Sequence, residues 1–161
     1  MKFIPLLLIL VLVGCSWLVP SPKKSQSAKG VQYKLQYKGS DWSPIKQDQS
    51  DYVFQHQNGT TIIINSFCGE FQNDPLKQMA EKTFNGLDNI KNIQEKSMTV
   101  FNREAYSMQA DGGLDGVTVN IKVINMRRNN CYFDFVRITP NGIKLIDNQP
   151  EDFINQVEFL L

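Results

Sequence analysis

The dipeptide Asn58-Gly59 constrains the fold of this chain more than any other local feature of its sequence. Two largely apolar segments, residues 52–57 and 60–67, flank it. Asparagine and glycine both tolerate positive φ angles, which a two-residue type I′ turn requires at its two central positions. The pattern therefore predicts a β-hairpin, in which His56 lies opposite a residue near Thr61.

Further segments show the features of strands. Residues 31–38 alternate apolar and polar at every step, which is typical of a half-buried strand. Residues 39–51 are predicted to form a loop. The remaining predicted strands are residues 93–100, 105–110, 117–126 and 131–138, with hairpin turns predicted at 101–104 and 127–130.

Two segments carry the signals of helices. Asp74 is expected to cap a first helix, with Pro75 in its first turn, where the missing N–H costs nothing. One apolar stripe follows at helical spacing: Leu76, Met79, Ala80, Thr83, Phe84 and Leu87. Residues 150–152 are expected to open a last helix, whose stripe is Phe153, Ile154, Val157 and Leu160.

This order of elements predicts an α+β fold, a twisted antiparallel sheet of about six to seven strands packed between helices. Over residues 31–161 it resembles the PsbP/Mog1/DcrB type of domain, although no single residue motif carries the resemblance. Members of that group bind partners or have unknown roles, and they share no catalytic site. The resemblance therefore implies a sandwich that acts as a binding or accessory module.

The beginning of the chain resembles the export signal of bacterial lipoproteins. Lys2 precedes an apolar run over residues 3–13, which suits a signal peptide better than a membrane span. The run ends in Leu12-Val13-Gly14-Cys15, which resembles a lipobox. That resemblance implies that residues 1–14 are a signal peptide and that Cys15 is lipidated. The alternative is an uncleaved anchor helix over residues 3–19.

Lipidation would fix the location of the protein. Several acyl chains anchor a protein stably, because each buried CH₂ contributes about 0.8 kcal/mol and one chain alone is marginal. Residues 15–30, rich in Ser, Pro and Lys, then read as the lipidated cysteine and a flexible tether, and residues 31–161 as a single domain. Ser16 follows the cysteine, which in Gram-negative lipoproteins implies the outer membrane, facing the periplasm.

The charge balance excludes one class of partner. The chain has 17 Lys and Arg against 16 Asp and Glu, whereas nucleic-acid binders normally show a clear basic excess. Its 42% hydrophobic residues are enough for a packed core and exclude disorder of the whole chain. Removal of residues 1–14 would leave 16 basic and 16 acidic residues, since Lys2 is the one charge lost. The lipid would therefore provide the anchoring.

Cys68 and Cys131 are the two thiols that remain once Cys15 is lipidated. An exported protein meets oxidising conditions, so the pair predicts a disulfide between the end of one strand and the beginning of another. Two separate buried thiols are the alternative. A cysteine nucleophile would need a base, and hairpin pairing keeps His56, the one histidine, away from Cys68.

The other candidate sites have simpler interpretations. Asp111 and Asp115 lie among three glycines, but their spacing differs from an EF-hand, and the glycines suit a tight reversal between strands. Arg127-Arg128 reads as a solvated turn. No catalytic residue, metal site or cofactor is predicted.

Two functions are compatible with these features. The first is a non-catalytic envelope lipoprotein that binds a protein partner, with an exposed apolar patch on the sheet or on the Trp42 loop. The alternative is a periplasmic lipoprotein that carries a small ligand in an apolar cavity between sheet and helix. The two functions are distinguished by whether the apolar stripes that contain Phe84 and Phe153 close the core or leave space for a ligand.

Overall fold

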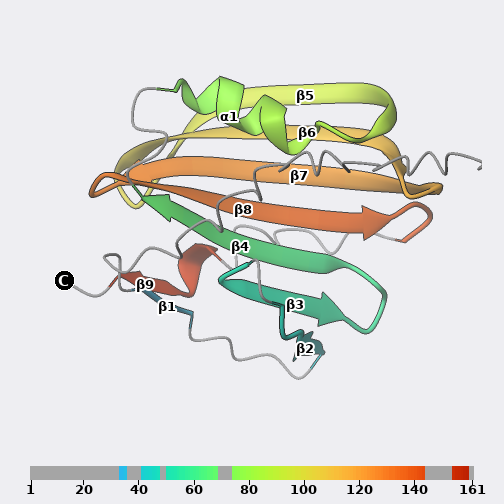
Figure 1. Cartoon of the computed structure of the whole chain (residues 1–161), viewed down its shortest axis with the longest axis horizontal. Helices are drawn as coiled ribbons and strands as arrows, with labels where there is room; N and C mark the ends of the chain where they lie inside the picture. The colour runs from blue at the N-terminus through green and yellow to red at the C-terminus, as the bar shows by residue number, and fades with distance from the viewer. Residues whose placement is uncertain (1–32, 36–40, 48–49, 69–73, 144–153, 160–161) are drawn as a thin grey trace, which may run out of the picture.

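The computed structural model describes residues 33–35, 41–47, 50–68, 74–143 and 154–159. Their main feature is a seven-stranded antiparallel sheet in the order β2-β3-β4-β8-β7-β6-β5 (Figure 1). Its strands are β2 (Trp42–Pro44), β3 (Tyr52–His56), β4 (Thr61–Cys68), β5 (Asp88–Val100), β6 (Arg103–Leu114), β7 (Val117–Arg128) and β8 (Cys131–Pro140). Two short strands, β1 (Tyr33–Leu35) and β9 (Val157–Phe159), pair antiparallel in a separate ribbon.

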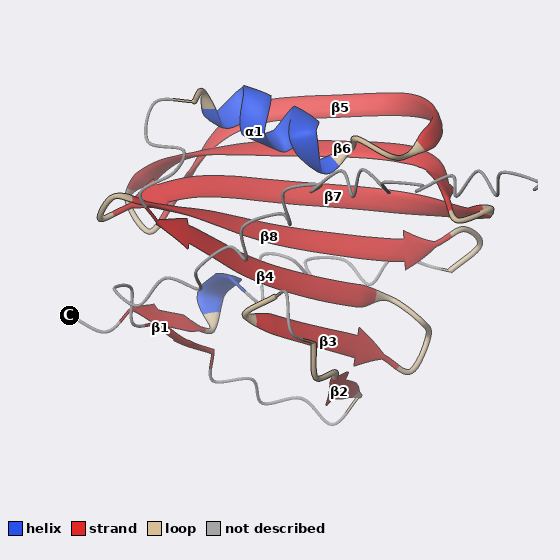
Figure 2. Ribbon diagram, viewed as in Figure 1, coloured by secondary structure: helices blue, strands red, loops and turns tan. Residues whose placement is uncertain are grey.

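Alternation of side chains along the strands produces an apolar cluster on each face of the sheet. The helix α1 (Leu76–Thr83) lies against β6 and β7 on one face (Figure 2). The helix-side cluster comprises Ala80, Phe84, Met108, Ala110, Val119, Ile121, Val123 and Val136. The ribbon-side cluster includes Ile62, Ile64, Ile124, Met126, Phe133 and Phe135, packed with Val157 of β9 and with Tyr33, Leu35 and Phe159. The sheet is thus covered by a helix on one face and by the β1–β9 ribbon on the other.

The predicted apolar stripe of the first helix faces the sheet. Ala80 is fully buried and Phe84 is 3% exposed, and burial of one such aromatic side chain contributes roughly 1.5–3 kcal/mol. The predicted cap is wrong. Pro75, with φ −57° and ψ 141°, occupies the N-cap position, and no side chain caps the helix. Asp74 instead accepts a hydrogen bond of 2.8 Å from Lys82.

The predicted hairpin is confirmed as β3–β4, but its turn differs from the prediction. Gly59 has a φ of +88°, whereas Asn58 is not among the residues with positive φ. The N–H of His56 donates to the carbonyl of Thr60, and the Asn58 Oδ1 accepts from the Thr60 N–H. These bonds close a three-residue loop with glycine at its left-handed position, which is the next most common hairpin geometry after the two-residue turns.

Three other hairpins have two successive residues with positive φ, as type I′ turns require. Phe101-Asn102 joins β5 to β6, Asp115-Gly116 joins β6 to β7, and Asn129-Asn130 joins β7 to β8. The four predicted strands from residue 93 onward are therefore confirmed, and each is longer than predicted. In the glycine-rich segment, residues 111–116, the chain reverses only at Asp115-Gly116. Asp111 to Leu114 still belong to strand β6.

Three predictions about the elements are corrected. The predicted loop over residues 39–51 contains β2, which pairs with β3. The last helix does not extend as predicted: Ile154 and Asn155 are helical, but Val157–Phe159 form a strand on β1, and Phe153 and Leu160 lie outside the described residues. In the part of the chain that the structure describes, the sheet is consequently packed against one helix, α1, and not between two. Among the described residues, no helix is long and apolar enough to cross a membrane.

Candidate functional site

The predicted lipidation site and tether cannot be placed in the fold. Cys15 and residues 16–30 lie outside the described residues, as do residues 1–14. The proposal of lipidation therefore depends on the sequence, and the described domain contributes the sites that follow.

Cys68 and Cys131 form a disulfide in the structure. Both lie at strand ends, since Cys68 ends β4 and Cys131 begins β8, and the antiparallel register places them directly opposite each other. Their Cα atoms are 4.1 Å apart, well below the separation of about 7 Å beyond which two cysteines cannot be bridged. The bond joins two neighbouring strands at the centre of the sheet, at the same end as the β7–β8 turn.

The side chain of His56 packs against Trp42 and accepts a hydrogen bond in the β3–β4 loop, which indicates a structural role. It lies opposite Trp42 on β2, and the two rings are 5.0 Å apart in an edge-on arrangement. Its Nδ1 accepts a hydrogen bond of 3.1 Å from the Asn58 N–H in the β3–β4 loop. Because His56 lies at the loop end of the hairpin and Cys68 at the other end of β4, the structure does not bring them together.

Asp111 is engaged by two asparagines and not by a metal-ligand cluster. The Asn92 and Asn120 side-chain amides donate to its carboxylate at 2.7 and 2.8 Å. These hydrogen bonds favour the charged form and hold the pKa of Asp111 below its ordinary value. They tie β5 to β6 and β6 to β7 at the bulged end of β5. Among the described residues, no group of three or more His, Cys, Asp or Glu is placed to hold a metal ion.

A row of polar side chains crosses the helix side of the sheet. The register places Asn65 of β4, Asp134 of β8 and Asn125 of β7 side by side. Burial raises the pKa of the Asp134 carboxyl to about 7, and its Oδ1 is buried without a hydrogen-bond partner. The Asn125 amide donates to the hydroxyl of Tyr132, whose pKa burial also raises.

A second polar network lies on the ribbon side. The hydroxyls of Tyr33 and Ser66 both donate to Oδ2 of Asp51, the former at 2.7 Å. Tyr33 also packs edge-on against Phe133, with ring centroids 5.7 Å apart. Burial raises the pKa of the Tyr33 hydroxyl, so it remains a neutral donor. This network fastens β1 to the sheet and has a structural role.

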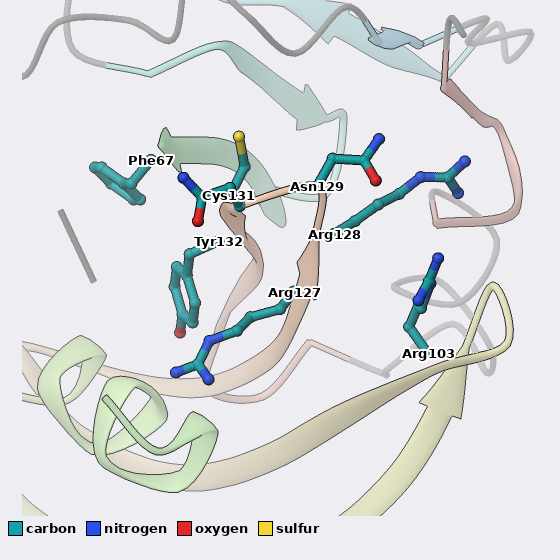
Figure 3. A pocket seen from close by; sticks show the side chains of 8 residues that line it. Phe67, Arg103, Arg127, Arg128, Asn129, Cys131 and Tyr132 are labelled. Carbon is teal, nitrogen blue, oxygen red and sulfur yellow. The ribbon is translucent and has the colours of Figure 1, made fainter. Parts of the chain in front are cut away.

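A pocket of about 230 Å³ lies at the end of the sheet where β7 turns into β8. Eight residues line it: Phe67, Arg103, Arg127, Arg128, Asn129, Asn130, Cys131 and Tyr132. Figure 3 shows the side chains of Arg103 and Arg128 on one side of the pocket and that of Arg127, near Tyr132, on the other. The interpretation of Arg127-Arg128 as a solvated turn is corrected, because both side chains have buried guanidinium nitrogens at this pocket.

Sequence reasoning missed the contribution of Arg103. It precedes Arg128 by 25 positions in the sequence and joins it only through the pairing of β6 with β7. The signal was present in the hairpin pattern: once residues 105 and 126 are paired, positions 103 and 128 lie at the same end of the two strands. The polar row of Asn65, Asp134 and Asn125 could likewise be recognised only once the register between β4, β8 and β7 is known.

Comparison with known proteins gives a likeness of fold. No protein-family model and no curated protein matches the chain. A crystal structure from Bacteroides thetaiotaomicron VPI-5482 matches 76% of this chain with a TM-score of 0.54 and 14% identity, and the chain spans 43% of that protein. The crystal structure of LpqN, involved in cell envelope biogenesis of Mycobacterium tuberculosis, matches with a TM-score of 0.52 and 12% identity, covering 80% of this chain and 83% of LpqN.

The solution structure of cyanobacterial PsbP from Synechocystis sp. PCC 6803 has a TM-score of 0.48 and 9% identity, over 81% of this chain and 92% of that one. The domain thus shares its fold, an antiparallel sheet with a short helix against it, with LpqN and with the Bacteroides protein.

Proposed function

We propose that this chain is a bacterial envelope lipoprotein, anchored through Cys15 in the outer membrane and facing the periplasm. In this proposal its domain is non-catalytic and acts as an accessory module that binds another envelope protein. The lipobox-like residues 12–15 support the anchoring. The disulfide between Cys68 and Cys131 supports export, since such bonds persist in oxidising compartments. The fold shared with LpqN is compatible with an envelope role.

The observation that supports partner binding is the exposed edge strand β5 of the sheet. β5 is 13 residues long and stands last in the sheet, with β6 as its neighbour among the described strands (Figure 1). Such an edge presents unpaired backbone donors and acceptors, to which an extended segment of a partner can add as a further strand. Ile90 and Ile93 on this strand are 40% and 55% exposed, which adds apolar contact area.

The irregular pairing of β5 defines where a partner strand would add. Register shifts interrupt its pairing with β6 between Asp88 and Lys91 and between Lys91 and Gln94. Bulges of this kind protect an edge from strand addition. Residues 94–100 pair regularly, so we assign the backbone contacts to them and the apolar contacts to the isoleucines before them.

The alternative, a carrier with a ligand between helix and sheet, has less support. Met79, Ala80 and Phe84 of the α1 segment are all buried, and the latter two belong to the helix-side cluster. These side chains occupy the space in which the ligand would lie. The companion residue Phe153 lies outside the described residues.

Photocrosslinking in living cells tests the partner-binding surface. A photoreactive amino acid at Ile93 is expected to give a discrete crosslinked species with another envelope protein. The same amino acid at Ile45, 37% exposed and close to the opposite edge strand β2, is the matched control. Absence of a crosslink from position 93, or equal crosslinking from both positions, would contradict the proposal.

A further inference from the structure

We infer that the pocket at the β7–β8 turn binds a phosphate group, presented by a lipid headgroup or by a soluble phosphate compound. The pocket is defined by the eight lining residues given above, of which Arg103, Arg127 and Arg128 are cationic. None of the eight is acidic. None of the lining residues belongs to β5, and the inference does not depend on the proposed partner binding.

Two arginines of the pocket lie at the same end of neighbouring strands. Ala105–Met126 is the last pair of the β6–β7 ladder at this end, and Arg103 and Arg128 each lie two residues beyond it. Figure 3 shows the two side chains on the same side of the pocket. Both guanidinium groups line one pocket, and like charges on neighbouring strands repel each other. An anion between the two guanidinium groups would convert this repulsion into attraction.

The position of Arg128 is fixed by packing. Its guanidinium carbon lies 4.3 Å from the centroid of the Phe159 ring in β9, a cation–π distance. Stacking on a ring occupies the face of a guanidinium and leaves its N–H groups directed outward in the plane. The Arg128 Nε is buried and has no hydrogen-bond partner. A ligand oxygen in the pocket would supply the missing acceptor.

Arg127 adds further donors on the helix side. Its Nε and Nη2 are buried without hydrogen-bond partners, and its charge acts on the neighbouring Tyr132 hydroxyl. Glu104 lies one residue beyond the same end of the ladder, yet it forms no ion pair with Arg127 in the part of the chain that the structure describes. Buried donors of a charged group that lack acceptors are costly, and this cost favours occupation by an anion.

The number of cationic donors favours phosphate over a single carboxylate. A phosphate monoester carries a charge of about −1.5 to −2 at pH 7 and three acceptor oxygens, so it can bridge two guanidinium groups. The pocket volume of about 230 Å³ also leaves room for part of the carrier. Phe67 and Tyr132, whose rings are 6.5 Å apart, offer apolar contact to that part.

Titration of the purified, processed full chain in a non-ionic detergent tests the inference. Inorganic phosphate is expected to bind saturably by calorimetry and to raise the melting temperature more than sodium chloride of equal ionic strength. Arg103→Gln, at an exposed position, is expected to weaken phosphate binding about tenfold or more, since a charge-assisted hydrogen bond is lost. Arg128→Gln is expected to weaken binding at least as much.

Lys46→Gln, just after β2 at the opposite edge of the sheet, is the matched control, because it removes the same charge from an exposed position that does not line the pocket. Its affinity for phosphate is expected to equal that of the wild type. Unchanged secondary structure by circular dichroism shows that the arginine variants are folded. Equal phosphate affinity in the wild type and Arg103→Gln, or no saturable binding at all, would overturn the inference.

Two further probes distinguish the sources of the group. Binding of the chain to vesicles of phosphatidylcholine with phosphatidylglycerol, lost in Arg103→Gln and competed by inorganic phosphate, would assign the pocket to lipid headgroups. Phosphate binding without such vesicle binding would assign it to soluble compounds. Tighter binding of a polyglutamate peptide than of phosphate, again dependent on Arg103, would assign the pocket to carboxylates and overturn the inference.

Discussion

Asp134 shows how a single residue can set the pH dependence of this domain. Its carboxyl lies in the polar row on the helix side of the sheet, where burial raises its pKa from an ordinary value of 3.8 to about 7. The folded protein therefore binds a proton on Asp134 that the unfolded chain releases between about pH 4 and pH 7. In that window the free energy of unfolding falls as the pH rises, and above pH 7 the loss is complete.

Asp134→Asn tests this linkage. Three pKa units correspond to about 4 kcal/mol, the upper limit of the stability lost between pH 4 and pH 8. The variant keeps the shape of the side chain without the charge, so its free energy of unfolding should be nearly constant over this range and exceed that of the wild type at pH 8. Urea denaturation at several pH values measures it. Glu81→Gln, on the exposed side of α1, should leave the wild-type slope intact; the same slope in Asp134→Asn would refute the assignment.

At the scale of elements, the hairpins depend on residues that accept positive φ. Asn102 in the β5–β6 turn has a φ of 58°, and asparagine tolerates this region better than alanine does. Asn102→Ala is expected to lower the free energy of unfolding by about 1 kcal/mol, whereas Asn102→Gly should lower it less. Denaturant titration compares the two. Equal effects of alanine and glycine would show that the turn geometry is not the cause.

Local pattern was sufficient for most elements and failed where a distant partner decided the conformation. Six of the seven strands of the large sheet and the stripe of α1 follow from period-two and helical spacing of apolar residues. The spacing of Ile154 and Val157 also fits a helix, but residues 157–159 gain backbone partners on β1, which lies more than 120 positions earlier. A strand with such a remote partner leaves little local signal. β2 was missed because three residues are too few to show alternation.

The candidate sites also divide into one that the sequence alone predicts and others that depend on the pairing of distant strands. The pairing of Cys68 with Cys131 could be predicted by counting thiols in an exported chain. The pocket could not, because Arg103 and Arg128 belong to different strands and meet only once the β6–β7 register is known. The environment of Asp134 likewise depends on which face of β8 is covered.

At the scale of the whole molecule, the disulfide closes a loop of 63 residues between two central strands. In the chain-entropy description, loss of such a cross-link lowers the free energy of unfolding by about 4 kcal/mol. The double variant Cys68→Ser/Cys131→Ser is expected to show this loss in denaturant titration, while Cys15→Ala should match the wild type. Alkylation of both thiols in unreduced wild-type protein would show instead that the bond is absent in the cell.

The central claim is that acyl chains on Cys15 hold this folded domain at a bacterial membrane. Intact mass spectrometry of the chain purified from membranes tests it most directly. The account predicts a chain that begins at Cys15 and carries the added mass of a diacylglycerol, and loss of both processing and membrane association in Cys15→Ala. A processed chain without acyl mass, or an uncleaved chain that begins at Met1 in the soluble fraction, would contradict the account.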